Sequence, residues 1–189
     1  MNWIIDKTIE FCYGHRVWTQ TLNGEYANDL KCACRHLHGH EGKVMIHLEG
    51  EKLDELTGMV TDFRHLEWLK KWVNENIDHQ FILDIEDPLY KQLIGDEKLV
   101  DVYIPATLDL RDTGNRTIAG WKVDLTNIRP ETPEYEYKEG FFLVDFVPTS
   151  EKLSQWMANL VQIKMKPLDV KVHSVEWWET PKSRSIYYV

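Results

Sequence analysis

The chain has few basic residues for its length: it carries 22 Lys and Arg against 31 Asp and Glu, a formal net charge of −9 at pH 7. Nucleic-acid-binding domains are normally basic because they neutralise phosphates. The charge therefore argues against a nucleic-acid partner. To bind a smaller polyanion, the chain would need a local cluster of cations.

Long apolar runs are also missing. No stretch approaches the roughly 18 to 20 consecutive apolar residues that a membrane-spanning helix requires. The residues from Met1 to Asp6 lack the basic segment and long apolar stretch of a secretory signal. We therefore expect a cytoplasmic protein that does not interact with membranes.

Cysteine is scarce, with only Cys12, Cys32 and Cys34 in the chain. An odd number of cysteines near histidines of metal-ligand type favours thiol chemistry in a reducing compartment over a disulfide framework.

Apolar residues are nevertheless plentiful, at 43% of 189 residues, so the chain can bury a substantial core as one domain over 1–189. Alternating or β-branched patterns predict strands, and apolar residues at helical spacing predict two helices, the second capped by Thr149 or Ser150. The predicted strands cover 2–12, 42–50, 168–178 and 185–189, and the predicted helices cover 62–74 and about 148–166.

The stretch 88–147 has signals of its own. Residues 100–104 and 141–145 are strand-like, whereas 107–115 and 129–139 are charged and rich in turn-forming residues. Long loops without structure are uncommon in compact domains, so we expect an inserted hairpin or lid at about 88–147.

Three histidines form the most informative pattern. His38 and His40 point to the same side of an extended strand, because strand side chains alternate with a period of two. A His-x-His pair alone is more often structural, but His15 lies in a second short motif and Cys34 precedes His38 by four residues. Three neutral imidazoles around Zn²⁺ leave its fourth position open, as in catalytic zinc sites.

Two further pairs are candidates for chemistry. Asp78-His79 either ends a helix or forms a carboxylate–imidazole pair suited to proton transfer. Glu179-Thr180 either closes a strand or supplies a carboxylate that accepts paired N–H donors from a heterocycle.

Taken together, these motifs resemble the 6-pyruvoyl-tetrahydropterin synthase and 6-carboxy-tetrahydropterin synthase family, over residues 3–85 and 146–189. The motifs occur in the family's order: Phe11 to Arg16 with His15, Cys34-x-x-x-His38-Gly39-His40, Gly58-Met59-Val60-Thr61-Asp62-Phe63, Asp78-His79, Pro148-Thr149-Ser150-Glu151, and Glu179-Thr180.

The resemblance implies an α+β tunnelling fold, a four-stranded antiparallel sheet with two helices on one face. It also implies a homohexamer, a dimer of trimers, with active sites at subunit junctions. The implied substrate is the small molecule 7,8-dihydroneopterin triphosphate.

The same resemblance assigns roles to residues. His15, His38 and His40 match the zinc ligands, and Cys34 matches the catalytic thiol. Asp78 and His79 match its proton-relay partners, and the Glu179-Thr180 motif matches the pterin-binding site, with Glu179 as the anchor. The candidate cations for the triphosphate are Arg16, Lys31, Arg35, Lys182 and Arg184.

The spacing between cysteine and His38 bears on which branch of the family the chain resembles. Three residues separate Cys34 from His38, as in the bacterial enzymes that make 6-carboxytetrahydropterin and acetaldehyde for 7-deazaguanine and queuosine biosynthesis. Cys32, with five intervening residues, resembles the animal enzymes that make 6-pyruvoyltetrahydropterin. We favour Cys34 and the carboxy-forming lyase. The alternatives are the pyruvoyl-forming enzyme and a non-catalytic pterin-binding protein. A second departure is Leu83-Asp84, where the family has Leu-Asn.

Overall fold

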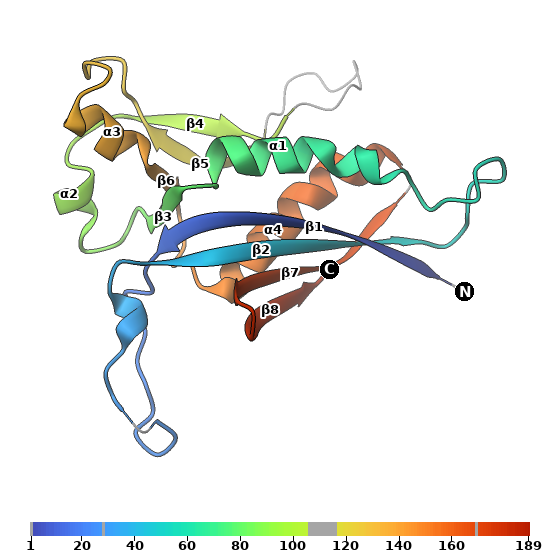
Figure 1. Ribbon diagram of the computed structural model, residues 1–189, viewed down its shortest axis with the longest axis horizontal. Helices are drawn as coiled ribbons and strands as arrows, with labels where there is room; N and C mark the ends of the chain where they lie inside the picture. The colour runs from blue at the N-terminus through green and yellow to red at the C-terminus, as the bar shows by residue number, and fades with distance from the viewer. Residues whose placement is uncertain (1, 28, 106–116, 169) are drawn as a thin grey trace.

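The computed structural model describes residues 2–27, 29–105, 117–168 and 170–189. Within these residues, eight strands form one mixed sheet in the order β4-β5-β6-β3-β1-β2-β7-β8 (Figure 1). The strands are β1 Trp3–His15, β2 His38–Gly50, β3 Gln80–Asp84, β4 Leu99–Tyr103, β5 Ile118–Val123, β6 Phe141–Val144, β7 Lys171–Thr180 and β8 Ser183–Tyr188.

The predicted four-stranded antiparallel sheet is therefore wrong. Strands β1, β2, β7 and β8 do form an antiparallel group, but β3 adds to β1 in parallel, and β6 adds to β3 in parallel. Strands β5 and β4 extend the sheet further. The added strands pair the main chain of β1 only at its end, from Tyr13 to His15.

The β1–β2 hairpin is longer than the sequence predicts. Its antiparallel register runs from Trp3 opposite Gly50 to His15 opposite His38. The alternation of buried and exposed side chains continues beyond the predicted strand ends. This extension carries the candidate histidines of both strands into the same sheet.

Both predicted helices are confirmed, and they pack into one core. Helix α1, Glu67–Asn76, follows a 3₁₀ turn, η2 Phe63–Leu66, and the Asp62 side chain caps that turn. Helix α4, Ser150–Met165, begins where the Thr149 side chain accepts a hydrogen bond from the main chain. The core that joins them to the central strands includes Ile9, Phe11, Val44, Ile46, Leu48, Leu69, Val73, Leu153, Met157, Val161, Val175 and Trp177.

The stretch 88–147, which the sequence analysis treats as an insertion, contributes three strands to the sheet within its described residues. Strands β4 and β5 pair as antiparallel neighbours, and the predicted strands at 100–104 and 141–145 are confirmed as β4 and β6. Helix α2 covers Tyr90–Leu93 and α3 covers Pro133–Glu139. A second core of Leu83, Ile94, Val123, Phe141 and Leu143 lies under this part.

The sequence analysis describes two stretches, 107–115 and 129–139, as rich in turn-forming residues. The stretch 107–115 lies outside the described residues. The stretch 129–139 begins with a turn at 130–131 and continues into helix α3. The Thr132 side chain caps α3, and Pro133 occupies its first turn, a position that proline favours.

Residues 16–27 and 29–37 form an arm that extends from the ends of β1 and β2 (Figure 1). Two buried carboxylates hold its base: Trp18 Nε1 donates to Asp84 Oδ2 at 3.0 Å, and Arg16 Nε lies 3.0 Å from Asp87 Oδ2. The arm ends in a 3₁₀ turn, η1 Ala33–Arg35, just before β2. A third turn, η3 Lys166–Leu168, follows α4.

None of the helices in the described parts of the chain is both long and apolar enough to cross a membrane.

Candidate metal centre and active site

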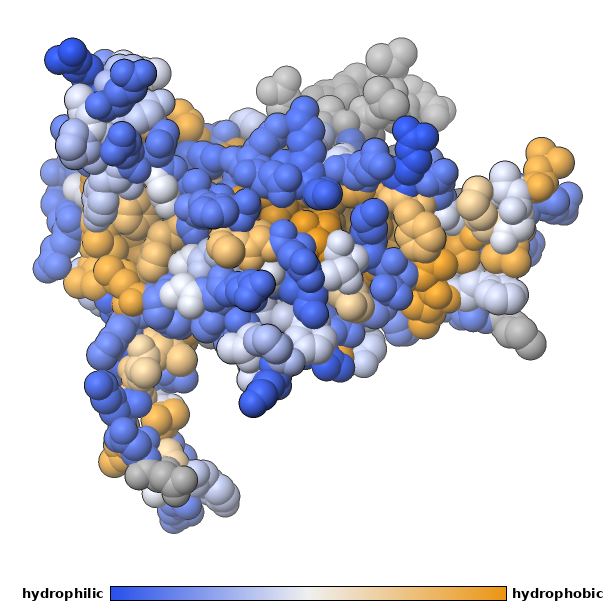
Figure 2. Space-filling model, in the orientation of Figure 1, coloured by the Kyte–Doolittle hydropathy of each residue, from blue (hydrophilic) through white to orange (hydrophobic). Residues whose placement is uncertain are grey.

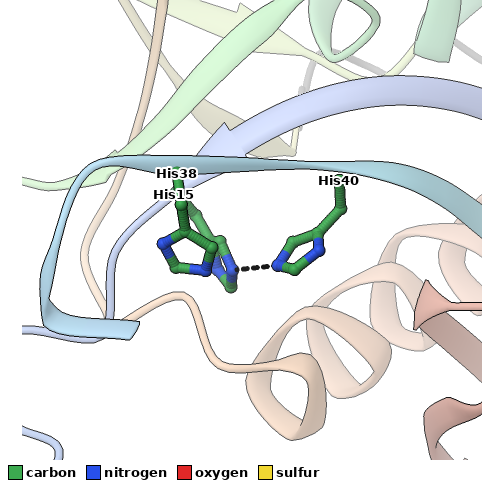
Figure 3. A group of neighbouring side chains, drawn as sticks. All are labelled: His15, His38 and His40. Atoms are coloured by element: carbon green, nitrogen blue, oxygen red, sulfur yellow. Dashed lines mark hydrogen bonds between the residues drawn. The ribbon is translucent and has the colours of Figure 1, made fainter. Parts of the chain in front are cut away.

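Three imidazoles meet on the face of the sheet that the helices cover. His15 ends β1, and His38 and His40 begin β2, directly across the hairpin. Their ring centroids lie 4.6 to 5.0 Å apart, and Figure 3 shows the rings turned toward one another. The Nε2 atoms of His15 and His40 are 3.1 Å apart.

The outer ring nitrogens fix the tautomers of two of these histidines. His15 Nδ1 donates to the Pro148 carbonyl at 2.6 Å, and His38 Nδ1 donates to the His36 carbonyl at 2.8 Å. A carbonyl oxygen can only accept, so each neutral ring keeps its proton on Nδ1 and has a lone pair on Nε2. The Nε2 of His38 is buried and has no hydrogen-bond partner.

Burial favours the neutral form of His15 and His40. It lowers the pKa of His15 to about 4, although the Pro148 carbonyl partly opposes that shift. Burial also lowers the pKa of His40, and the neighbouring His38 adds to the effect. Neutral imidazole is the form that binds metals.

The donor set fits a divalent metal ion. Two nitrogens at the metal–nitrogen distance of zinc proteins, on a tetrahedron, are about 3.3 Å apart, close to the observed His15–His40 separation. The Nδ1–carbonyl bonds are the outer contacts that usually orient metal-binding histidines. The unpartnered His38 Nε2 gains a partner if a cation occupies the space between the rings.

The side chains of Glu179 and Thr180, at the end of β7, lie on opposite sides of the sheet. Glu179 Oε1 lies 3.7 Å from His15 Nε2, and burial, with Glu151 nearby, raises the pKa of the Glu179 carboxyl. Thr180 instead lines a small cleft on the other side of the sheet, with Glu10, Glu41, Gly42, Lys43, Trp178 and Pro181. The structure thus brings only Glu179 to the histidines.

Asp78 and His79 lie apart from the histidine cluster. His79 Nδ1 is 3.0 Å from Asp78 Oδ1, so the predicted carboxylate–imidazole pair is present. Both residues lie beside Cys12, which alternates with Tyr13 along β1 and so faces away from His15.

Cys34 and Cys32 lie in and beside the turn η1, next to the end of β1. The Val17 amide donates to the Cys34 carbonyl at 2.7 Å, and Cys32 Sγ approaches the Leu30 carbonyl at 3.7 Å. Among the residues that the structure describes, neither thiol belongs to a cluster of three metal-ligand side chains.

The sequence analysis missed two features: the Tyr13 ring beside the histidines, and the contact of Cys12 with Asp78. Tyr13 packs against His15 and His40, with centroid distances of 5.3 and 5.6 Å, and its hydroxyl accepts from Trp177 Nε1. The period of two along β1 could have placed this ring beside His15. The contact of Cys12 with Asp78 had no such signal, because the two lie 66 positions apart in the sequence.

Comparison with known proteins places the chain in a family. A sequence model of 6-pyruvoyl tetrahydropterin synthase matches residues 4–189. The chain belongs to the 6-pyruvoyl tetrahydropterin synthase family. The family resemblance carried by the sequence motifs is thereby confirmed.

Individual members of the family are similar over different lengths. The 6-carboxy-5,6,7,8-tetrahydropterin synthase of Aquifex aeolicus is 30% identical over 99% of this chain and 98% of its own. The human 6-pyruvoyl tetrahydrobiopterin synthase is 30% identical over 53% of this chain and 70% of its own.

Solved structures agree on the fold. An uncharacterized protein from Wolinella succinogenes superposes with a TM-score of 0.87 at 44% identity, covering 100% of this chain and 98% of its own. The 6-pyruvoyl tetrahydropterin synthase of Caenorhabditis elegans has a TM-score of 0.54 at 16% identity, covering 100% and 96%, which shows the fold alone.

Proposed function

We propose that this protein is a zinc-dependent lyase. It converts 7,8-dihydroneopterin triphosphate and water into 6-carboxy-5,6,7,8-tetrahydropterin, acetaldehyde and triphosphate. The observation that carries the proposal is the cluster of His15, His38 and His40, with its inward Nε2 atoms and a buried nitrogen that has no partner. Three protein ligands leave a coordination position for substrate.

Two observations favour the carboxy-forming branch. The relative that matches nearly the whole length of the chain is named for that product, whereas the human pyruvoyl-forming enzyme matches about half of the chain. The spacing of Cys34 and His38 points the same way. The product would feed 7-deazaguanine and queuosine biosynthesis in the cytoplasm.

Each proposed residue has a distinct task. When bound, zinc supplies Lewis acidity to the substrate's side-chain hydroxyls, which makes the adjoining C–H bonds more acidic. Glu179 anchors the pterin beside the histidines by accepting its N–H donors. Cys34 takes a proton near the pterin ring, and His79, oriented by Asp78, moves the second proton.

These groups act together only if two subunits meet. The histidines and the Asp78–His79 pair lie on opposite faces of β1, so one chain does not assemble the complete site. Three subunits would form a trimer, and two trimers would form a hexamer. In this assembly, the Asp78–His79 pair of one subunit would lie beside the histidines of another.

The surface of the chain supports such association. Large hydrophobic side chains are exposed at the N-terminal end of β1 and along 56–63. Figure 2 shows hydrophobic residues, in orange, at the end of the molecule that carries the N-terminus. The exposed side chains are Trp3, Ile4, Leu56, Met59 and Phe63. Extended apolar surface of this kind usually marks an interface.

The triphosphate requires cations, and two candidates are already engaged. Arg16 pairs with Asp87, and Arg184 pairs with Glu176 at 3.0 Å. Lys31, Arg35 and Lys182 are therefore the better candidates.

Product analysis tests the proposal. Zinc-loaded protein is incubated with 7,8-dihydroneopterin triphosphate, and the products are identified by mass spectrometry. We expect 6-carboxytetrahydropterin together with acetaldehyde. A 6-pyruvoyl product without acetaldehyde would establish the alternative enzyme. Substrate left intact by zinc-loaded protein would indicate a non-catalytic pterin-binding protein.

A further inference from the structure

A second group of metal-ligand side chains lies on the face of β1 opposite the histidine cluster. Cys12 on β1 and the pair Asp78-His79 before β3 each offer one ligand atom, and these atoms lie within 4.8 Å of one another. They are a thiol, a carboxylate oxygen and an imidazole nitrogen. Cys12 and His79 are exposed in the single chain.

The main chain holds this cluster in place. The Cys12 amide donates to Asp78 Oδ1 at 2.8 Å, and the His79 amide donates to the Cys12 carbonyl at 2.7 Å. His79 has a φ of 60°, in the left-handed region that side chains other than glycine seldom adopt. Such conformations concentrate at functional sites, where the surrounding contacts enforce them.

We propose that Cys12, Asp78 and His79 form a second binding site, for a divalent cation of the zinc class. Thiolate, imidazole and carboxylate are the three ligand types that zinc takes from proteins, and the thiolate favours zinc or cobalt over magnesium or calcium. The 3.0 Å separation of Asp78 Oδ1 and His79 Nδ1 suits two ligand atoms of one ion. Water completes the coordination.

Occupancy of this site has a consequence that rests on the proposed function. Asp78 and His79 are the proposed proton relay, and a cation bound to them removes the lone pairs that the relay uses. The second site is therefore inhibitory. Zinc in the histidine cluster supports turnover, and additional zinc at Cys12 stops it.

Cobalt binding tests the site without any pterin. Only a thiolate ligand gives Co²⁺ an intense near-ultraviolet charge-transfer band, and the histidine cluster contains no thiol. Metal-free protein titrated with Co²⁺ should develop this band, and so should a His38→Ala variant, in which the first site is damaged. Cys12→Ser should abolish the band, while Cys32→Ser and Cys34→Ser should retain it. Asp78→Asn should weaken the binding by about tenfold or more.

Three results of the cobalt titration would overturn the proposed site. The absence of a band in wild-type protein, or its survival in Cys12→Ser, would overturn the site. Loss of the band in Cys34→Ser would also overturn it, because the thiolate would then belong elsewhere. These results do not depend on turnover, so failure of the lyase reaction would leave the test of the site intact.

Inhibition is measured on the active enzyme. Zinc beyond the amount that fills the histidine cluster should lower wild-type turnover by about tenfold, relative to its rate with that cluster alone filled. The Cys12→Ser variant, compared with its own starting rate, should lose much less. Equal losses in the two proteins would overturn the inhibitory role.

Discussion

At the scale of residues, two main-chain carbonyl oxygens determine which ring nitrogens of His15 and His38 carry a lone pair. The carbonyls of Pro148 and His36 occupy the outer nitrogens of His15 and His38, so that both inner nitrogens carry lone pairs. Two main-chain atoms thus orient both rings in the way that metal-binding histidines are usually oriented.

The role of Cys34 can be separated from that of Cys32 by substitution. We expect Cys34→Ala to retain zinc but to lose turnover by roughly 10²- to 10⁴-fold, because a general base is removed while the metal ligands remain. Steady-state rates and metal analysis of the purified variants provide the measurement. Cys32→Ala is the matched control and should keep most activity. The reverse result would transfer the role to Cys32.

Glu179 lies close enough to His15 for either of two roles. As a pterin anchor, Glu179→Gln should raise KM at least about tenfold and leave the zinc content unchanged, because a charged acceptor is lost from the substrate. Glu151→Gln, which removes a nearby exposed carboxylate, is the control. Loss of zinc from the Glu179 variant would show instead that the carboxylate supports the metal site.

The site was only partly predictable from the sequence. The period of two along a strand placed His38 and His40 together, and the motif around His15 supplied the third ring. No local pattern places Cys12 beside Asp78, because that contact depends on how β3 docks against β1. The separation of the histidines from the relay is likewise a property of the folded sheet.

At the scale of elements, strands β4, β5 and β6 of the stretch 88–147 enlarge the sheet at the edge beyond β3. These strands meet the central sheet through β6 and β3, and the main chain of Gly120 on β5 packs closely against β6. A Cβ atom at Gly120 would lie 2.6 Å from the Leu143 carbonyl oxygen and 2.6 Å from the Phe142 ring.

Gly120→Ala should therefore destabilise the protein by about 1 to 3 kcal/mol, because neither a carbonyl in a sheet nor a buried ring moves freely. The matched control is Gly140→Ala, where the nearest atom lies 3.4 Å away and φ is −73°. Urea unfolding compares the two. Equal stability in both variants would show that β5 and β6 can separate without cost.

Elements with a strong local pattern were predicted, and those with long-range partners were not. The apolar stripe of α4 and the alternation along β2 identify these elements without any tertiary information. Strand β3 is short and pairs in parallel with β1 and β6, which no nearby residue specifies. Helix α3 did carry a local signal, since a capping Thr132 precedes Pro133.

At the scale of the whole molecule, the two faces of the central sheet carry different groups of side chains. One face is covered by α1 and α4 and holds the histidine cluster near its end. The other face carries Cys12 and the cleft at Thr180. A second subunit is needed to bring the two sets of groups together in the proposed reaction.

The free energy of unfolding of the metal-free protein should fall as the pH falls, because His15 takes up a proton more readily in the unfolded chain. Burial lowers the pKa of His15 from 6.5 to about 4, so the unfolded chain takes up a proton more readily than the folded one between these values. The stabilisation is present above pH 6.5 and is lost as the pH falls through about 4. It amounts to about 3 kcal/mol.

Urea unfolding of chelator-treated protein between about pH 7 and pH 4 measures this loss. The control is His15→Asn, which cannot take up the proton and should show a shallower dependence on pH. Identical pH dependence in the two proteins would contradict the assignment.

X-ray absorption at the zinc edge tests the central claim most directly, on protein loaded with a single zinc ion per chain. We predict three imidazole nitrogens at about 2.0 to 2.1 Å, and loss of this signal in His38→Ala. Failure to retain stoichiometric zinc, or a sulfur ligand at about 2.3 Å in the first ion bound, would contradict the account.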